Sequence, residues 1–122
     1  MAKIMIVDDS AYARRVHRGI LERAGHVVLE ASTGSGALET FFHDHPDLVL
    51  LDLSMEDMSG IEVLRTLRRM DAGARVIVVS ADVQRSTSDS VMTAGANRFL
   101  AKPANSDQLV ATVSEVLDAP SP

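Results

Sequence analysis

The residues best suited to chemistry in this sequence are three acids, Asp8, Asp9 and Asp52, together with Ser80 and Lys102. Each follows a short apolar run that is too brief for a helix, which is typical of a buried strand in a parallel sheet. In an open α/β sheet, the carboxyl ends of parallel strands share one edge, where ligands bind. We therefore expect these five side chains to meet at that edge.

These side chains suit the binding and transfer of a phosphoryl group. Two carboxylates about 4 Å apart repel each other by roughly 4 kcal/mol at an effective dielectric of about 20, so three of them favour a bound cation. Oxygen ligands without His or Cys favour Mg²⁺, which leaves positions for phosphate oxygens. Lys102 offers a positive charge and Ser80 a hydroxyl donor to such oxygens. Asp52 is then a nucleophile, because a carboxylate needs no general base to attack phosphorus.

Strands and helices alternate along the chain, which favours an α/β fold with a doubly wound, five-stranded parallel sheet and right-handed crossovers. The expected strands are Lys3–Val7, His26–Ala31, Asp47–Asp52, Arg75–Ser80 and Arg98–Ala101. The expected helices are Ala11–Ala24, Gly36–Asp44, a segment from about Ser59 to Met70, Ser86–Ala94 and Ser106–Asp118. The candidate site residues then lie at the ends of strands one, three, four and five.

Capping residues and apolar spacing support these helices. Ser10 is the expected N-cap of the first helix, and Ser59 with Glu62 has the spacing of a capping box at the third. In the first helix, apolar residues at spacings of three and four predict the buried face. Its expected members are Ala13, Val16, Ile20 and Ala24.

Composition limits the possible functions. The chain has 122 residues, enough for one domain, with a formal net charge of -5 and no cysteine. The negative charge argues against a nucleic-acid-binding surface, which needs a concentrated positive field. The lack of cysteine excludes disulfides and thiolate metal sites, and no apolar segment has membrane-spanning length. We therefore expect a soluble, cytoplasmic protein that binds neither nucleic acid nor membranes directly.

Four motifs give the chain a resemblance to a known family. They are Val7-Asp8-Asp9-Ser10, Asp52-Leu53-Ser54-Met55 with Gly60 eight residues past the acid, Ser80-Ala81, and Gly95-Ala96-Asn97-Arg98-Phe99-Leu100-Ala101-Lys102-Pro103. With these motifs the chain resembles the CheY-like receiver domains of two-component response regulators over nearly its whole length. The resemblance implies the strand order 2-1-3-4-5, a receiver domain at residues 1–118 and a tail or start of a linker at 119–122.

The resemblance also implies roles for the acids. Asp52 would accept the phosphoryl group in a reaction that requires Mg²⁺. Asp9 would bind the metal directly and Asp8 largely through water. The backbone carbonyl of Ser54 would be a further metal ligand.

The other site residues would contact the phosphoryl group or respond to it. Ser80 and Lys102 would bind its oxygens, and Phe99 would be an aromatic switch whose rotamer follows Ser80. Ser54 and Asp82 would flank the path of the water that hydrolyses the acyl phosphate. The resemblance thus implies which residues form the phosphorylated state and which control its lifetime.

The same resemblance implies a signalling domain that catalyses only its own phosphorylation and slow dephosphorylation. The phosphoryl group would come from a histidine kinase or a histidine phosphotransfer protein. A downstream effector protein would bind the face formed by the fourth helix, the fifth strand and the fifth helix. The chain would act alone or as part of a longer regulator.

Two residues depart from the usual family pattern. Glu56 stands where the family usually has proline, so we expect altered dynamics in the loop after Asp52. Phe99 replaces a frequent tyrosine and lacks its hydroxyl. The resemblance further implies a cis peptide bond between Lys102 and Pro103, which is uncommon before proline in general.

Three other classes of protein fit the sequence less well. A haloacid-dehalogenase-like phosphohydrolase needs a second acid two residues after the nucleophile, where this chain has Ser54. A flavodoxin-like electron carrier needs a glycine- and hydroxyl-rich phosphate loop after the first strand, where Asp8 and Asp9 would repel phosphate. A degenerate receiver that only binds proteins is disfavoured by the complete set of five site residues.

The fourth helix is expected to be the least stable. Six of the eight residues from Ser86 to Thr93 have middling or poor helix propensity, a summed penalty of roughly 3 kcal/mol relative to alanine. Only Val91, Met92 and Ala94 offer apolar contacts with the sheet. Such an element opens at low cost, so we expect this helix to be the moving part of the switch.

Overall fold

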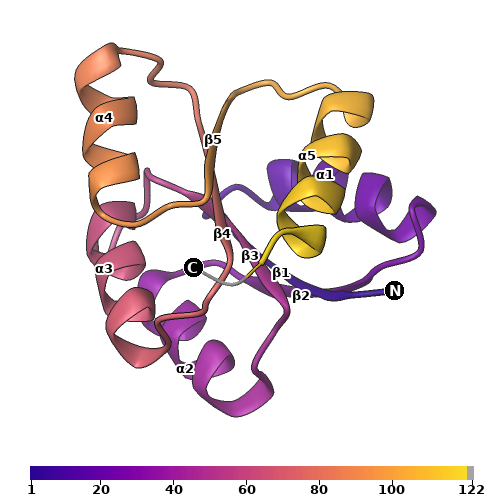
Figure 1. Ribbon diagram of the computed structural model, residues 1–122, viewed down its shortest axis with the longest axis horizontal. Coiled ribbons are helices and arrows are strands. Elements are labelled where there is room, and N and C mark those ends of the chain that lie inside the picture. Colours follow the sequence, from indigo (N-terminus) through magenta and orange to yellow (C-terminus); the bar gives the residue numbers. More distant parts are fainter. Residues whose placement is uncertain (121–122) are drawn as a thin grey trace.

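The computed structural model describes residues 1–120, which form a five-stranded parallel sheet with helices on both faces (Figure 1). The strands are β1 Lys3–Val7, β2 Val27–Ala31, β3 Leu48–Asp52, β4 Val76–Ser80 and β5 Arg98–Ala101. The helices are α1 Ala11–Arg23, α2 Gly34–Asp44, α3 Gly60–Met70, α4 Arg85–Thr93 and α5 Ser106–Asp118. The strand order β2-β1-β3-β4-β5 confirms the predicted fold. Of the expected tail at 119–122, residues 121 and 122 lie outside the described residues.

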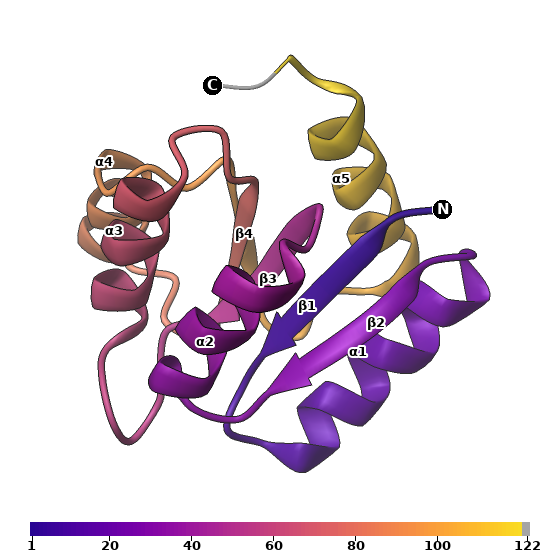
Figure 2. The same cartoon turned by 90° about the horizontal axis from the view of Figure 1, so that it is seen from below.

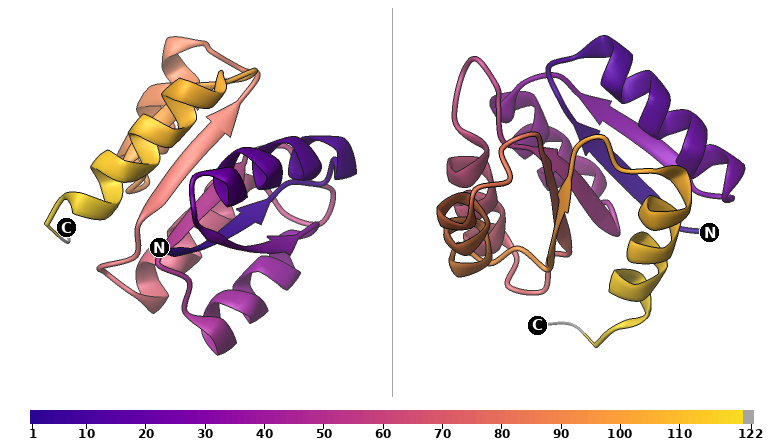
Figure 3. Two further views of the ribbon diagram at one scale, coloured as in Figure 1. Left: turned by 90° about the vertical axis from the view of Figure 1, so that its right-hand side faces the viewer. Right: turned by 90° about the horizontal axis from the view of Figure 1, so that it is seen from above.

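Helices α1 and α5 cover one face of the sheet, and α2, α3 and α4 cover the other (Figures 2 and 3). Because successive side chains of a strand point to opposite faces, β3 buries Val49 and Leu51 under α2–α4, and Leu48 and Leu50 under α1 and α5. All four are at most 2% exposed. Burial on both faces explains why this strand is a continuous apolar run.

The register of the strands brings the polar residues to one edge of the sheet. Val7 pairs with Leu51, and Asp52 pairs with Val79 on the next strand. The strands are parallel, so their carboxyl ends all point the same way. Asp8, which follows Val7, therefore lies beside the end of β3.

The predicted N-caps are confirmed. Ser10 Oγ accepts a hydrogen bond from Ala13 N at 3.1 Å, and Ser59 Oγ accepts one from Glu62 N at 3.2 Å. Helix α2 begins at Gly34, earlier than the predicted start at Gly36, because side chains from outside the helix accept hydrogen bonds from its first N–H groups. The other helix boundaries differ from the prediction by a single residue or less.

The predicted buried face of α1 was wrong at two positions. Val16 and Ala24 are exposed, whereas His17 and Leu21 are buried beside Ile20. The apolar residues of this helix fit two overlapping stripes with helical spacing, so the sequence alone leaves the centre of the buried face open. Packing against the sheet selects the stripe that buries Leu21 completely.

Helix α4 is thinly anchored, as expected. Val91 is its one fully buried residue, and its N-cap, Gln84, makes no capping hydrogen bond through its side chain. Met92, which we expected to help anchor the helix, is 45% exposed because its position faces away from the sheet. Helix α5 buries three residues against the sheet by comparison.

The helices are short in relation to a lipid bilayer. The longest, α1 and α5, have 13 residues each. A helix needs about 20 consecutive apolar residues to span the hydrocarbon core of a membrane. Within residues 1–120, no helix combines the length and apolar character that crossing a membrane requires.

Candidate functional site

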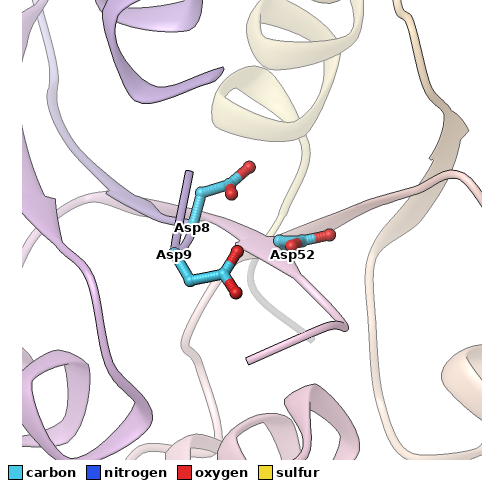
Figure 4. A group of neighbouring side chains, drawn as sticks. All are labelled: Asp8, Asp9 and Asp52. Carbon is cyan, nitrogen blue, oxygen red and sulfur yellow. The ribbon is translucent and has the colours of Figure 1, made fainter. Parts of the chain in front are cut away.

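Three carboxylates form the centre of the candidate site. Asp8 and Asp9 follow β1, and Asp52 ends β3, so neighbouring strands bring them together (Figure 4). One oxygen atom from each lies within 4.8 Å of those of the other two. Asp8 is 2% exposed and Asp52 7%, whereas Asp9 is an exposed residue. Two of the acids are therefore enclosed and the third faces solvent.

The loop that carries Asp8 is held on both sides. The backbone N–H of Asp8 donates a hydrogen bond to Ala31 O at 3.1 Å, and the backbone oxygen of Asp8 accepts one from Arg14 Nη1 at 2.7 Å. The carboxylate itself accepts a hydrogen bond from Ser10 N at 2.9 Å. Arg14 is fixed in turn by Glu30, whose Oε1 is 2.9 Å from Arg14 Nε. These contacts set the direction of the Asp8 side chain.

Lys102 reaches into the acid cluster from the end of β5. Its Nζ lies 2.9 Å from Asp8 Oδ2 and 3.3 Å from Asp52 Oδ1. Its backbone N–H donates to Ser80 O at 2.9 Å, which ties it to β4. Burial opposes the charge of Lys102, but the hydrogen bond with Asp8 and the negative charge of Asp52 outweigh it and raise the pKa of Lys102. The lysine is therefore a permanent cation.

The pKa of Asp52 is raised. Burial is the main cause and the negative charge of Asp8 adds to it, whereas Lys102 acts in the opposite direction and is outweighed. Three carboxylates against one ammonium group leave two negative charges uncompensated. An all-oxygen donor set with this charge fits Mg²⁺, which binds through one or two carboxylates and keeps several waters.

Ser80 is connected to α4 through Asp82. Ser80 is 3% exposed, and its Oγ accepts a hydrogen bond from Asp82 N at 3.0 Å. The Asp82 carboxylate accepts hydrogen bonds from Thr87 Oγ1 at 2.7 Å and from Gln84 N at 3.1 Å. The bond from Thr87, followed by that from Gln84, lowers the pKa of Asp82. The hydroxyl of Ser80 is thus linked to the start of the helix.

The remaining predicted residues lie outside the acid cluster itself. Phe99 pairs with Val78 on β4 and packs, partly buried, against the core under α2–α4. Ser54 is exposed in the loop between β3 and α3. The peptide bond between Lys102 and Pro103 is cis, as the resemblance implied. Within residues 1–120, no hydrogen bond or ion pair joins the side chains of the acids or Lys102 to those of the other four predicted residues. These four are Ser54, Ser80, Asp82 and Phe99.

Comparison with known proteins gives a consistent answer. Residues 4–114 match the family described as the response regulator receiver domain. The chemotaxis protein CheY of Bacillus subtilis is 38% identical over 117 residues, which cover 95% of this chain and 98% of that protein. The transcriptional regulatory protein KdpE of Mycobacterium tuberculosis is 40% identical over 111 residues, covering 91% of this chain and 49% of KdpE. A CheY-like receiver domain from Methanospirillum hungatei superposes with a TM-score of 0.92 at 30% identity, covering 97% of this chain and 94% of that one.

This chain belongs to the response regulator receiver domain family. Receiver domains are signalling phosphoacceptors rather than classical enzymes, as the sequence predicted. The cluster of Asp8, Asp9 and Asp52 is typical of the phosphorylation and metal site of a receiver. Membership of this family also implies that a kinase is a partner of the protein. The phosphohydrolase and flavodoxin-like alternatives are thereby excluded.

His17 is a neighbour of the receiver site that the sequence analysis missed. It is 7% exposed and lines a hollow together with Tyr12 and Lys102. Burial, followed by the charge of Lys102, lowers the pKa of His17 against the opposing influence of Asp8. His17 is therefore neutral at physiological pH. Its position, four residues after Ala13 and three before Ile20, has the spacing of a buried helix face. This spacing is the sequence signal that could have identified His17 as buried.

Proposed function

We propose that this receiver accepts a phosphoryl group on Asp52 from a phosphohistidine of a histidine kinase or histidine phosphotransfer protein. The observation that carries the proposal is the cluster of Asp8, Asp9 and Asp52, in which Lys102 Nζ lies 2.9 Å from Asp8 and 3.3 Å from Asp52. We assign Asp8, Asp9, Asp52 and the backbone carbonyl of Ser54 to a Mg²⁺ site. This residue set suits group transfer to a carboxylate.

In this reaction, an oxygen of Asp52 attacks phosphorus, the new O–P bond forms and the P–N bond of the phosphohistidine breaks. The imidazole leaves with the electron pair of that bond. Lys102 holds a positive charge beside the phosphoryl oxygens, and the Ser80 hydroxyl donates a hydrogen bond to one of them. Bound Mg²⁺ supplies further neutralisation of the carboxylates and the phosphoryl oxygens.

Beryllofluoride, a mimic of the phosphoryl group, tests the proposal in the presence of Mg²⁺. The amide resonances of Asp52 and Ser80 should shift together, because the mimic binds at the first residue and attracts the hydroxyl of the second. Chelation of Mg²⁺ should reverse the shifts. Unchanged resonances at both residues with Mg²⁺ present would reject the proposed site.

We further propose that phosphorylation remodels the face formed by α4, β5 and α5, where the effector protein binds. The Ser80 hydroxyl accepts a hydrogen bond from Asp82 N, and Asp82 holds the first turn of α4 through Thr87. A phosphoryl group that attracts this hydroxyl therefore shifts the start of α4. Phe99, which packs partly buried beside α4, then fills the space that is vacated.

Hydrogen exchange provides a measurement of this switch. Without phosphate, the amides of α4 should exchange faster than those of α1 and α5, because Val91 is the helix's one fully buried residue. The exchange of α4 should slow on phosphorylation. Equal protection of all three helices in both states would show that α4 is not the moving element.

We assign Ser54 and Asp82 to the control of the phosphorylated lifetime. Replacing either residue by arginine should lengthen the lifetime by about threefold or more, because a long side chain obstructs the approach of water. Thr87→Val is the control for Asp82→Arg, since it breaks the same hydrogen bond without adding bulk near Asp52. The assignment is wrong if the arginine variants hydrolyse at the parental rate, or if Thr87→Val slows hydrolysis equally.

We place the receiver domain at residues 1–118, because α5 ends at Asp118. Residues 119–122 would form a tail or the start of a linker. We propose that the protein acts in the cytoplasm without direct contact with nucleic acid or membranes. Its negative net charge of -5 suits a basic surface on a protein partner.

A further inference from the structure

The loop from Leu53 to Ser59 follows Asp52 and carries Ser54. Its base is closed by a hydrogen bond from Gly60 N to Leu53 O at 3.0 Å. A Cβ atom at position 60 would lie 2.5 Å from Leu53 Cα and 2.8 Å from Asp52 O, so only glycine permits this closure. The two ends of the loop are thus fixed directly at the site.

The far part of the same loop is fixed to α2. The carboxylate of Asp57 accepts hydrogen bonds from Gly34 N at 2.8 Å and from Ser35 N at 2.9 Å. These are the first two residues of α2, whose N–H groups have no partner within the helix. The two hydrogen bonds lower the pKa of Asp57, so the residue is ionised at neutral pH.

Met58 makes the second contact between this loop and α2. A Cβ atom at Gly34 would overlap Met58 Cγ and lie 2.7 Å from its Sδ. Met58 also packs against the hydrophobic core. The start of α2 and the loop therefore fit together closely, and a larger residue at position 34 would require Met58 to shift.

The segment that receives Asp57 also touches the other half of the site. Ala31, at the end of β2, accepts the hydrogen bond from the backbone N–H of Asp8. Gly34 and Ser35 follow three and four residues later. One short stretch of chain thus holds both the acid that follows β1 and the loop that follows β3.

We infer that Asp57 is a positioning residue for the metal, because its hydrogen bonds to the start of α2 hold the loop in which the Ser54 carbonyl lies. The inference rests on the proposed Mg²⁺ site. Asp57 acts through the loop and does not itself bind the metal.

Isothermal titration calorimetry of the metal-free protein with MgCl₂ tests the inference with two matched variants. Asp57→Asn and Glu56→Gln each remove one negative charge from adjacent exposed residues, but only Asp57 makes the hydrogen bonds to α2. We expect Asp57→Asn to raise the Kd for Mg²⁺ by about tenfold, the size usual for residues that orient metal ligands, and Glu56→Gln by less than about twofold.

Gly34→Ala provides a test without any change of charge. Its added methyl group displaces Met58, a residue of the loop, so it should also raise the Kd for Mg²⁺. Thermal unfolding without metal and amide spectra report the fold of each variant separately. An equal change of Kd in Asp57→Asn and Glu56→Gln, or parental affinity in either Asp57→Asn or a folded Gly34→Ala, would overturn the inference. No Mg²⁺ binding by the parent would instead reject the proposed function.

Discussion

Asp52→Asn is expected to abolish phosphorylation by acetyl phosphate or a phosphohistidine protein, lowering incorporation by at least about a thousandfold. An amide oxygen is too weak a nucleophile to form the acyl phosphate. Phosphate incorporation with Mg²⁺, and its loss on treatment with hydroxylamine, measure this directly. Glu39→Gln, an exposed acid of α2, is the control and should behave as the parent. Labelling of Asp52→Asn at the parental rate would show that another residue accepts the phosphoryl group.

The same substitution should stabilise the metal-free protein. Burial and the charge of Asp8 raise the pKa of Asp52 in the folded state. A raised folded-state pKa means that the native state binds the proton more tightly than the unfolded chain, so stability from this group is present at low pH and is lost as the pH rises. Once the pH exceeds the folded-state pKa the penalty is complete, and a neutral asparagine removes it.

The expected result is a higher melting temperature for Asp52→Asn at neutral pH without Mg²⁺, where about 4 °C corresponds to roughly 1 kcal/mol. The difference should shrink as the pH falls towards the ordinary aspartate pKa of about 3.9. Mg²⁺ should stabilise the parent more than the variant, because ligand binding to the native state adds stability. A variant that melts below the parent at neutral pH would contradict this account of the acid cluster.

Lys102→Ala should separate phosphorylation from the switch. The side chain contacts Asp8 and Asp52 at the site and would bind the phosphoryl group, so its loss leaves the phosphoryl oxygens without their lysine partner. The variant should keep its fold and bind Mg²⁺. When phosphorylated, however, it should show parental shifts around Asp52 and almost none across α4, β5 and α5, and partner affinity should stay at the unphosphorylated level.

Removal of this lysine also has a cost in stability. Breaking a buried ion pair typically destabilises a protein by about 3–5 kcal/mol, and less is expected here because the Lys102 side chain is 23% exposed. Lys3→Ala serves as the control, since Lys3 lies at the opposite end of the sheet from the acids. Ser80→Ala should share the loss of switching with a smaller loss of stability, because it removes only the hydrogen bond from Asp82 N. Parental partner binding by either phosphorylated variant would refute the role of these residues.

The strands, most of the helix boundaries and the convergence of the site residues could be predicted from the sequence. Short apolar runs predicted strands because burial on both faces of a parallel sheet removes the need for alternation. Ser10 and Ser59 predicted helix starts because a cap is a contact within one turn of the chain. Asp8, Asp52 and Lys102 were predicted to meet because parallel strands all end at one edge. Each of these inferences depends on local patterns or on a topology with few alternatives.

Tertiary packing selects the buried face of α1, because two overlapping stripes satisfy the same helical spacing and contact with the sheet distinguishes between them. It also decided that Asp57 is bound to Gly34, a hydrogen bond across 23 residues that no spacing rule predicts. The raised pKa of Asp52 belongs to this second group. Its causes are burial and the charge of Asp8, and both arise only when distant segments of the chain pack together.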